Sequence, residues 1–317
     1  MLRQIQFRAM NTDVGIWLWQ ADPQAETWLQ DAAQRFAAIE AELSRFQPDS
    51  GLSRLNGAAG AGPQPVSPLL WAVVSAALDA ARRSQGLFDP TLLYPLQRAG
   101  YDRSFEQLAP NLAGGVAART LDWGYQRVQT NPETTTVSLP AGLGLDLGGI
   151  GKGWAVDHVA QALAVHGPLL VDAGGDIRVV GAAQGEPWPI AVQDPFNEPQ
   201  DLLTLALTSG AVATSSIGGR LWTRDGQAMH HLLDPRTGQP SASDLHTVTV
   251  LAPTATVADV AAKVALILGS QRGRAYLASR GLRGLLSRRD GQQQTVGRLP
   301  LSHLMARPAV MQEEVVS

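Results

Sequence analysis

Residues 136–165 read TVSLPAGLGLDLGGIGKGWAVDHVAQALAV, and they decide how the rest of the sequence is interpreted. The apolar residues spaced along 136–148 predict a strand, and those of 154–165 recur at helical spacing, with Gly167 as the stop signal. The residues on the apolar face of this helix are Val156, Val159, Ala160 and Leu163. A strand, a glycine-rich turn and a helix in succession predict helices packed on a sheet.

The flanking sequence continues the mixture of strands and helices. Further strands are predicted over 14–19, 169–181, 187–195, 201–215 and 246–253. Further helices are predicted over 23–45, 68–84 and 256–268. Several strands are joined by hairpin-like turns and no strict βαβ rhythm appears. The sequence therefore favours an α+β fold of layered mixed or antiparallel sheets with packed helices over a doubly wound parallel sheet.

Composition excludes several classes of function. The 317 residues carry a net charge of −3, which gives no basic surface for nucleic acid. The sequence contains no cysteine, so disulfides, thiolate metal sites and a cysteine nucleophile are excluded. No apolar run reaches the length of a signal peptide or a membrane span. We therefore expect a cytoplasmic protein without membrane insertion.

Lysine is almost absent. Only Lys152 and Lys263 occur among the 25 basic residues, and the others are arginine. Arginine and lysine substitute for each other on a solvated surface but not in a tight site. The bias indicates a chemical role for these two lysines, with chance retention as the alternative.

Three local patterns are ambiguous by themselves. The run GGIGKG at 148–153 is typical of phosphate binding, yet Gly153 after Lys152 breaks the P-loop pattern and Trp154 breaks the dinucleotide fingerprint. A tight strand-to-helix turn is the alternative. His230 and His231 have no metal-ligand spacing, and a structural pair at a strand end is the alternative. Asp259 and Lys263 stand four residues apart on the predicted helix 256–268, and a surface ion pair is the alternative.

Seven stretches in a fixed order carry a resemblance to a known family. They are AMNTDV (9–14), ELSRFQPDSGLSRLN (42–56), GLFDPTLLYPLQRAGYD (86–102), LDLGGIGKGWAVD (145–157), VDAGGDIRVVG (171–181), HHLLDPRTGQP (230–240) and TVTVLAPTATVADVAAKVALILG (247–269). Together they resemble the ApbE family of FAD:protein FMN transferases over about residues 8–290. The segment 302–317 is predicted to be an irregular tail.

The resemblance implies a fold and an activity. The whole chain, 1–317, is expected to form one ApbE-like domain of two intertwined T-fold-like subdomains with FAD in the cleft between them. The implied reaction cleaves FAD, attaches FMN through a phosphodiester to a Ser or Thr hydroxyl of an acceptor flavoprotein, and releases AMP. The alternatives are an FAD pyrophosphatase that releases FMN and AMP, and a non-catalytic FAD-binding protein.

The resemblance also assigns candidate residues. It implies catalytic roles for His231 and Asp259, with His231 as the general base. The implied FAD-binding positions are Met10, Phe46, Leu87, Phe88, Asp89, Asp146, Lys152, Asp176 and Leu232. Phe46 is the implied flavin-stacking ring, and 146–152 is the implied pyrophosphate turn. Asn11 follows Met10 where the family has glycine.

The implied metal site departs from the family pattern. The family's Mg²⁺ ligands match the carbonyl of Gly149 and the carboxylate of Asp259, but Lys263 stands where a hydroxyl ligand is expected. Cleavage of a pyrophosphate requires a cation against the developing negative charge. Either Mg²⁺ or a lysine ammonium meets this requirement, and the sequence leaves both open.

Overall fold

The computed structural model describes residues 1–112, 122–197 and 199–302. Its centre is an eight-stranded sheet in the order β1-β2-β7-β8-β11-β16-β17-β18, with every neighbouring pair antiparallel. The strands are β1 (Leu2–Ala9), β2 (Thr12–Trp19), β7 (Leu169–Ala173), β8 (Asp176–Val180), β11 (Ser209–Ser216), β16 (Leu245–Ala252), β17 (Arg283–Arg288) and β18 (Gln293–Val296). The predicted α+β class is confirmed.

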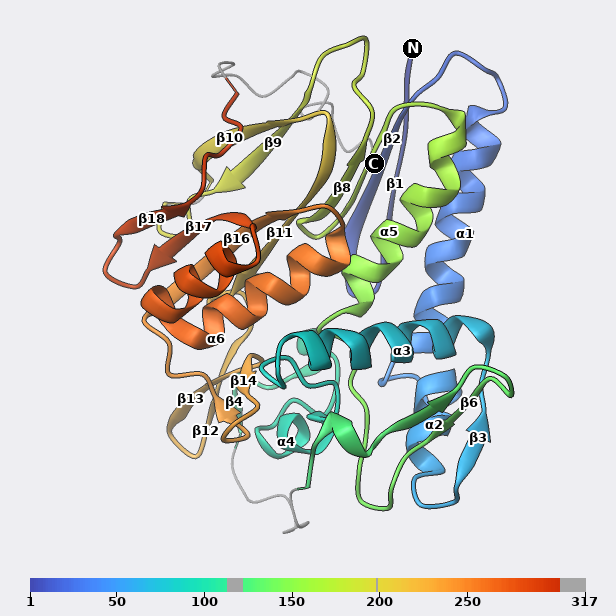
Figure 1. Cartoon of the computed structure of the whole chain (residues 1–317), viewed down its shortest axis with the longest axis vertical. Coiled ribbons are helices and arrows are strands. Elements are labelled where there is room, and N and C mark those ends of the chain that lie inside the picture. Colours follow the sequence, from blue (N-terminus) through green and yellow to red (C-terminus); the bar gives the residue numbers. More distant parts are fainter. Residues whose placement is uncertain (113–121, 198, 303–317) are drawn as a thin grey trace.

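Three helices cover one face of this sheet (Figure 1). They are α1 (Ala25–Leu43), α5 (Gly151–Leu163) and α6 (Ala255–Ser279). α5 packs against both α1 and α6, and Gly269 at φ 80° kinks α6. The alternation of β7 explains the burial: Val171 faces this helical layer, while Leu170 faces the opposite side.

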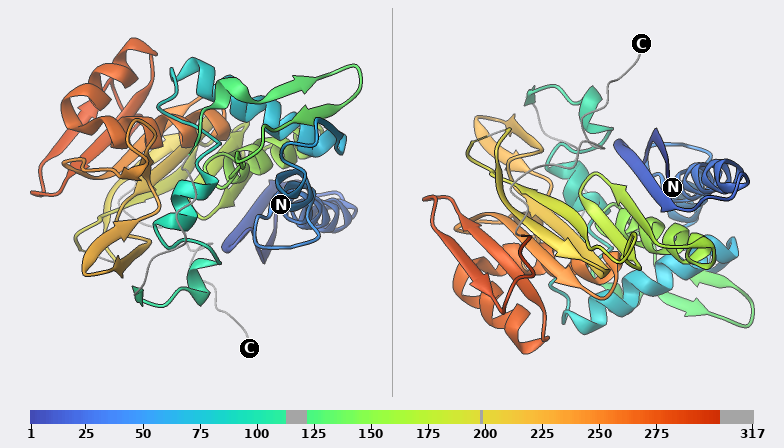
Figure 2. Two further views of the ribbon diagram at one scale, coloured as in Figure 1. Left: turned by 90° about the horizontal axis from the view of Figure 1, so that it is seen from below. Right: turned by 90° about the horizontal axis from the view of Figure 1, so that it is seen from above.

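A two-stranded ribbon covers the opposite face. It consists of β9 (Trp188–Gln193) and β10 (Asp201–Leu207), which pair antiparallel. Trp188 and Ile190 from β9 pack there with Val179 of β8 and Val212 of β11. The sheet is therefore buried on both faces at its centre, giving helix, sheet and ribbon layers (Figure 2).

The remaining elements gather beyond one end of the large sheet, in the lower half of Figure 1. The helices are α2 (Gly51–Gly57), α3 (Pro68–Arg83) and α4 (Leu93–Arg98). Three small sheets join β3 (Pro63–Pro65) to β6 (Thr136–Ser138) and β5 (Gln129–Asn131), β4 (Asn111–Leu112) to β12 (Leu221–Arg224) and β13 (Gln227–His230), and β14 (Leu233–Asp234) to β15 (Gln239–Pro240). Short 3₁₀ turns lie among them at 105–107 and 125–127, whereas the turn at 164–166 follows the far end of α5.

The strand predicted over 136–148 is mostly wrong. Only β6 is a strand, although Leu143, Leu145 and Leu147 are buried as the pattern requires. A side chain takes the place of a partner strand at Leu145: Asn56 Nδ2 donates to its carbonyl at 2.9 Å, and its amide donates to Asn56 Oδ1 at 2.7 Å. The segment is thus a buried loop that leads into α5, which begins at Gly151 rather than at residue 154.

Two tight hairpins end at the same edge of the fold. Met10 and Asn11 join β1 to β2 with φ of 53° and 58°, and Gly174 and Gly175 join β7 to β8 with φ of 62° and 88°. Two consecutive residues with positive φ are typical of the two-residue turn that matches strand twist. Asn11 tolerates this conformation better than most side chains, so it can replace glycine there.

Within the described ranges, no helix combines the length and apolar character that a membrane crossing requires. The predicted tail 302–317 lies, from residue 303 onward, outside the described residues. The division into two T-fold-like subdomains stays a prediction.

Candidate active site

A pocket of about 550 Å³ lies where the hairpin turns, the ends of α1 and β11, and the start of α5 meet the lower elements. Its size falls within the range of cofactor sites. Of the twelve candidate site residues, eleven line it: Met10, Phe46, Leu87, Phe88, Asp89, Asp146, Gly149, Lys152, His231, Leu232 and Asp259. Asp176 does not line it, but is buried directly behind Lys152.

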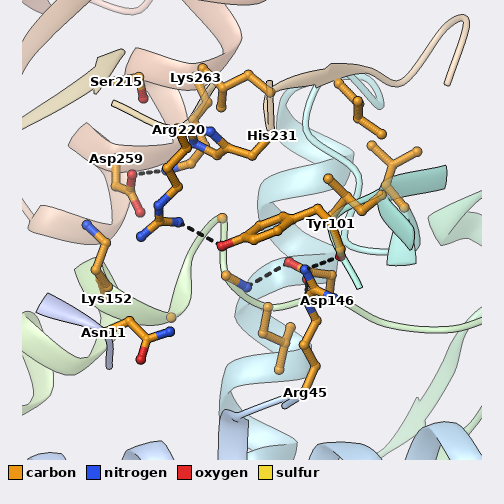
Figure 3. Close-up of a pocket in the computed structure, with 18 of the residues that line it drawn as sticks. Asn11, Arg45, Tyr101, Asp146, Lys152, Ser215, Arg220, His231, Asp259 and Lys263 are labelled. Atoms are coloured by element: carbon orange, nitrogen blue, oxygen red, sulfur yellow. Dashed lines mark hydrogen bonds and ion pairs between the residues drawn. The ribbon is translucent and has the colours of Figure 1, made fainter. Parts of the chain in front are cut away.

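One wall of the pocket is cationic. Lys152 at the start of α5 donates to Asp176 Oδ2 at 2.5 Å, and Lys263 on α6 donates to Asp259 Oδ1. The Asp176 and Asp259 side chains are each 2% exposed. The guanidinium of Arg220 reaches into the space beside Lys152 and Asp259 (Figure 3). Three cations therefore face the pocket, and two of them are each paired with a buried carboxylate.

The charges of these groups depend on one another. Burial would lower the pKa of Lys152, but the carboxylates of Asp176 and Asp259 outweigh it and raise the pKa above its ordinary value. Burial and the neighbouring Asp176 raise the pKa of Asp259 to about 6, against the opposing pull of Lys263 and Lys152.

His231 lies beside the three cations, and these surroundings disfavour the protonated imidazole. Burial, followed by the positive charges of Arg220, Lys263 and Lys152, holds the pKa of His231 well below its usual 6.5. Within the described part of the chain its buried Nδ1 has no hydrogen-bond partner. An imidazole that stays unprotonated at neutral pH can accept a proton.

His230 lies on the other side of the chain. It is 6% exposed, and its Nε2 lies 3.1 Å from the carbonyl of Ser241. His230 does not line the pocket, whereas His231 does. The structure thus separates a structural histidine from one available for chemistry.

The opposite wall is aromatic and held by a buried ion pair. Arg45 Nε lies 2.5 Å from Asp146 Oδ2, and the two side chains are 7% and 12% exposed. The Arg45 guanidinium stacks over Phe46 at 4.2 Å and over Tyr101 at 4.7 Å, while Arg220 Nη1 donates to the Tyr101 hydroxyl at 3.3 Å. Asp146 therefore holds Arg45 against the two rings, and Phe46 and Tyr101 both line the pocket.

The loop after α3 forms the third side of the pocket. Asp89 accepts from the amide and hydroxyl of Thr91, at 2.9 and 2.6 Å, and from the amide of Tyr125. This carboxylate therefore shapes the loop that presents Leu87 and Phe88, both pocket-lining. Burial raises the pKa of Asp89 in spite of these bonds.

A carboxylate from α5 fixes the start of α6. Asp157 accepts from the amides of Ala255 and Thr256, both at 2.8 Å, and from the Thr256 hydroxyl at 2.6 Å. A Cβ on Gly153 would lie 2.8 Å from the carbonyl of Ala255, so only glycine permits this close crossing of the helices. These contacts fix Lys152 and Asp259 relative to each other.

Comparison with known proteins agrees with this geometry. The model of the ApbE family matches residues 10–286. The chain belongs to the ApbE family. An FAD:protein FMN transferase of Treponema pallidum is 33% identical over 254 residues, covering 75% of this chain and 70% of the relative. One from Salmonella typhimurium is 29% identical over 258 residues, covering 79% and 73%.

Solved ApbE structures share the fold. The ApbE protein of Thermotoga maritima superposes with a TM-score of 0.83 at 28% identity, covering 93% of this chain and 96% of that one. The flavin transferase ApbE from Vibrio cholerae gives a TM-score of 0.76 at 25% identity, covering 94% and 98%.

The residues of this ApbE chain do not fit the expected Mg²⁺. Across residues 1–112, 122–197 and 199–302, no three His, Asp or Glu side chains gather as a metal-ligand set. Asp259 Oδ1 accepts a hydrogen bond from Lys263, and Asp259 Oδ2 is buried without a hydrogen-bond partner in the described structure. Mg²⁺ requires near-octahedral oxygen ligands and gives up its water reluctantly, so it usually binds one or two carboxylates and keeps several waters. Here the Lys263 ammonium lies on the carboxylate of Asp259, and its positive charge opposes a second cation at that carboxylate.

Sequence reasoning missed three residues that shape the ApbE pocket. Arg45 and Tyr101 lie inside the stretches quoted above, and the neighbourhood of Phe46 could have indicated Arg45. Arg220 lies outside all seven stretches. Because arginine is the ordinary basic residue of this chain, no single arginine stands out in the sequence.

Proposed function

We propose that this protein is an FAD:protein FMN transferase, which moves the FMN half of FAD onto a Ser or Thr hydroxyl of an acceptor protein and releases AMP. The observation that carries the proposal is the placement of His231, which lines one pocket together with three cations and with the rings of Phe46 and Tyr101. The names of the ApbE relatives support the same reaction.

The pocket suits the two parts of FAD that matter for the reaction. The ammoniums of Lys152 and Lys263 and the guanidinium of Arg220 would neutralise the diphosphate. The faces of Phe46 and Tyr101 would bind the planar isoalloxazine, since aromatic rings stack on flat π-systems.

The chemical step needs one base. His231 takes the proton of the incoming hydroxyl while its oxygen attacks the phosphorus of the FMN half. A new P–O bond forms, the P–O bond to AMP breaks, and AMP departs with the bridging oxygen. The product is FMN held by a phosphodiester, and the proton then leaves His231 for solvent. The cations stabilise the charge that builds on the departing phosphate.

Incubation of the purified protein with FAD and a candidate acceptor protein tests this proposal. We expect the intact mass of the acceptor to rise by one FMN less one water, with one AMP released per modification, and substitution of the modified hydroxyl to abolish both. AMP and free FMN appearing without any acceptor would indicate a pyrophosphatase. FAD binding without AMP under either condition would indicate a binding protein.

A further inference from the structure

The side chain of Lys263 occupies the space between Asp259 and the glycine-rich turn before α5. It pairs with Asp259 across one turn of α6, and the two side chains are 14% and 2% exposed. A Cβ built on Gly149 would lie 3.7 Å from both Cδ and Cε of Lys263, so the aliphatic stem lies against that turn. Lys263, Asp259 and Gly149 all line the pocket. This burial excludes an ordinary solvated surface pair.

The charge balance at this point opposes a second cation. The carboxylate of Asp259 would attract a divalent ion, but the Lys263 ammonium on the same carboxylate would repel it. Lys152 and Arg220 lie near Asp259 and add further repulsion. The protein's own cations therefore oppose the binding of a divalent ion at Asp259.

The use of lysine supports the same conclusion. Both lysines of the chain line this pocket, and each donates to a buried aspartate. An ammonium is a compact point charge, whereas a guanidinium is broad and planar. Arginine serves at every other basic position of the sequence, so the two exceptions lie where a compact cation is needed.

We propose that the Lys263 ammonium, held by Asp259, takes the place of a divalent metal in this pocket, so that the protein neutralises the diphosphate of its substrate without Mg²⁺. The role of Lys263 in the reaction rests on the proposed function, whereas its exclusion of a metal does not. The experiment therefore measures metal binding and the reaction separately.

The first readout is metal binding. FAD-loaded protein is titrated with Mn²⁺ and the free ion is followed by electron paramagnetic resonance, for wild type, Lys263→Thr and Lys263→Met. We expect no stoichiometric binding to wild type. Lys263→Thr frees both oxygens of Asp259 and adds a hydroxyl on the same helix face, so it should bind one Mn²⁺ at least about 10-fold more tightly than wild type.

The second readout is AMP release with acceptor, in EDTA and in Mg²⁺. Wild type should differ less than about twofold between the two conditions. Lys263→Met removes the charge at constant length, and should lose about 10²-fold or more in EDTA, the usual cost of one charge-stabilising group. Lys263→Thr should be slow in EDTA and recover in Mg²⁺.

One control variant keeps the outcome decisive. Lys263→Met leaves a buried carboxylate unpaired, so the double variant Lys263→Met with Asp259→Asn restores neutrality and should fold, bind no Mn²⁺ and remain slow. Stoichiometric Mn²⁺ binding by wild type, with AMP release abolished by EDTA and Lys263→Met as active as wild type, would overturn the proposal. If no variant releases AMP, the proposed function fails, and the Mn²⁺ titration still decides whether Lys263 excludes a metal.

Discussion

Replacing His231 by glutamine tests the assignment of the general base. The change removes the proton acceptor but keeps a polar side chain of similar size, so kcat should fall by about 10²–10⁴-fold while FAD affinity stays within a few-fold. The melting temperature should not change, because the Nδ1 of His231 makes no hydrogen bond in the described structure.

The pH dependence sharpens this prediction. The surrounding cations lower the pKa of His231, so the acid limb of kcat/KM, which reports free protein, should lie well below pH 6.5. Bound FAD brings negative phosphates into the same space. These negative charges favour the protonated imidazole and so raise the pKa of His231 in the complex. The acid limb of kcat should therefore lie at higher pH than that of kcat/KM.

The rate of AMP release is measured across pH at saturating FAD, which gives the acid limb of kcat, and at limiting FAD, which gives the acid limb of kcat/KM. His230→Gln is the matched control. His230 is buried and bonded to the carbonyl of Ser241, so this change should lower the melting temperature and leave kcat within a few-fold. Equal losses of kcat in the two variants, or an acid limb that persists in His231→Gln, would refute the assignment of His231 as the base.

Three further changes probe the walls and supports of the pocket. Phe46→Ala should weaken FAD binding several-fold, since an aromatic contact is worth about 0.5–1.5 kcal/mol beyond burial; unchanged affinity in a fluorescence titration would show that the flavin lies elsewhere. Asp157→Ala should lower the free energy of unfolding in urea by about 1–3 kcal/mol, because the amides that it caps at the start of α6 lose their partner. Asp157→Asn keeps one acceptor oxygen and should lose less stability. Equal losses in the two variants would contradict the capping role. Burial raises the pKa of Asp172 from 3.8 to about 6 in the folded protein, so its ionisation opposes folding as pH rises through this range. Asp172→Asn keeps an acceptor for the amide of Gly175. It should therefore raise the free energy of unfolding near pH 8 by up to about 3 kcal/mol, seen as a higher melting temperature, and have little effect near pH 4. An effect that does not change with pH would show that the ionisation of Asp172 does not oppose folding.

Periodicity predicted the regular elements well where a partner element buries the whole apolar face. The segment 169–181 became the β7–β8 hairpin, and helix 256–268 is the first half of α6. Periodicity failed over 139–148, where leucines are buried without a neighbouring strand. The amide of Asp146 donates to the carbonyl of Pro90, and Asn56 bonds to both backbone groups of Leu145. No local pattern reveals partners that are so distant in sequence.

The candidate site shows the same division between features visible in local sequence and features that depend on distant partners. Residues on a continuous motif, such as Lys152 in the glycine-rich turn and His231 before the Asp-Pro turn, were found because their neighbours in sequence are distinctive. Asp176 was placed against the ligand, whereas the structure puts it behind Lys152. The brace of Arg45 on Asp146 and the contact of Arg220 with Tyr101 join residues about 100 or more positions apart. Such pairs are defined by the tertiary fold alone.

The pocket draws on residues from Met10 to Ile267, and this span has a consequence for synthesis of the protein. Phe46, Tyr101 and Lys152 leave the ribosome first, whereas Asp259 and Lys263 emerge only with α6. Because a domain generally folds as a unit, the early segments alone do not form the pocket, and they lack His231 and two of its three cations. We expect nascent and truncated chains to leave cellular FAD untouched, so that only a nearly finished polypeptide competes for this cofactor.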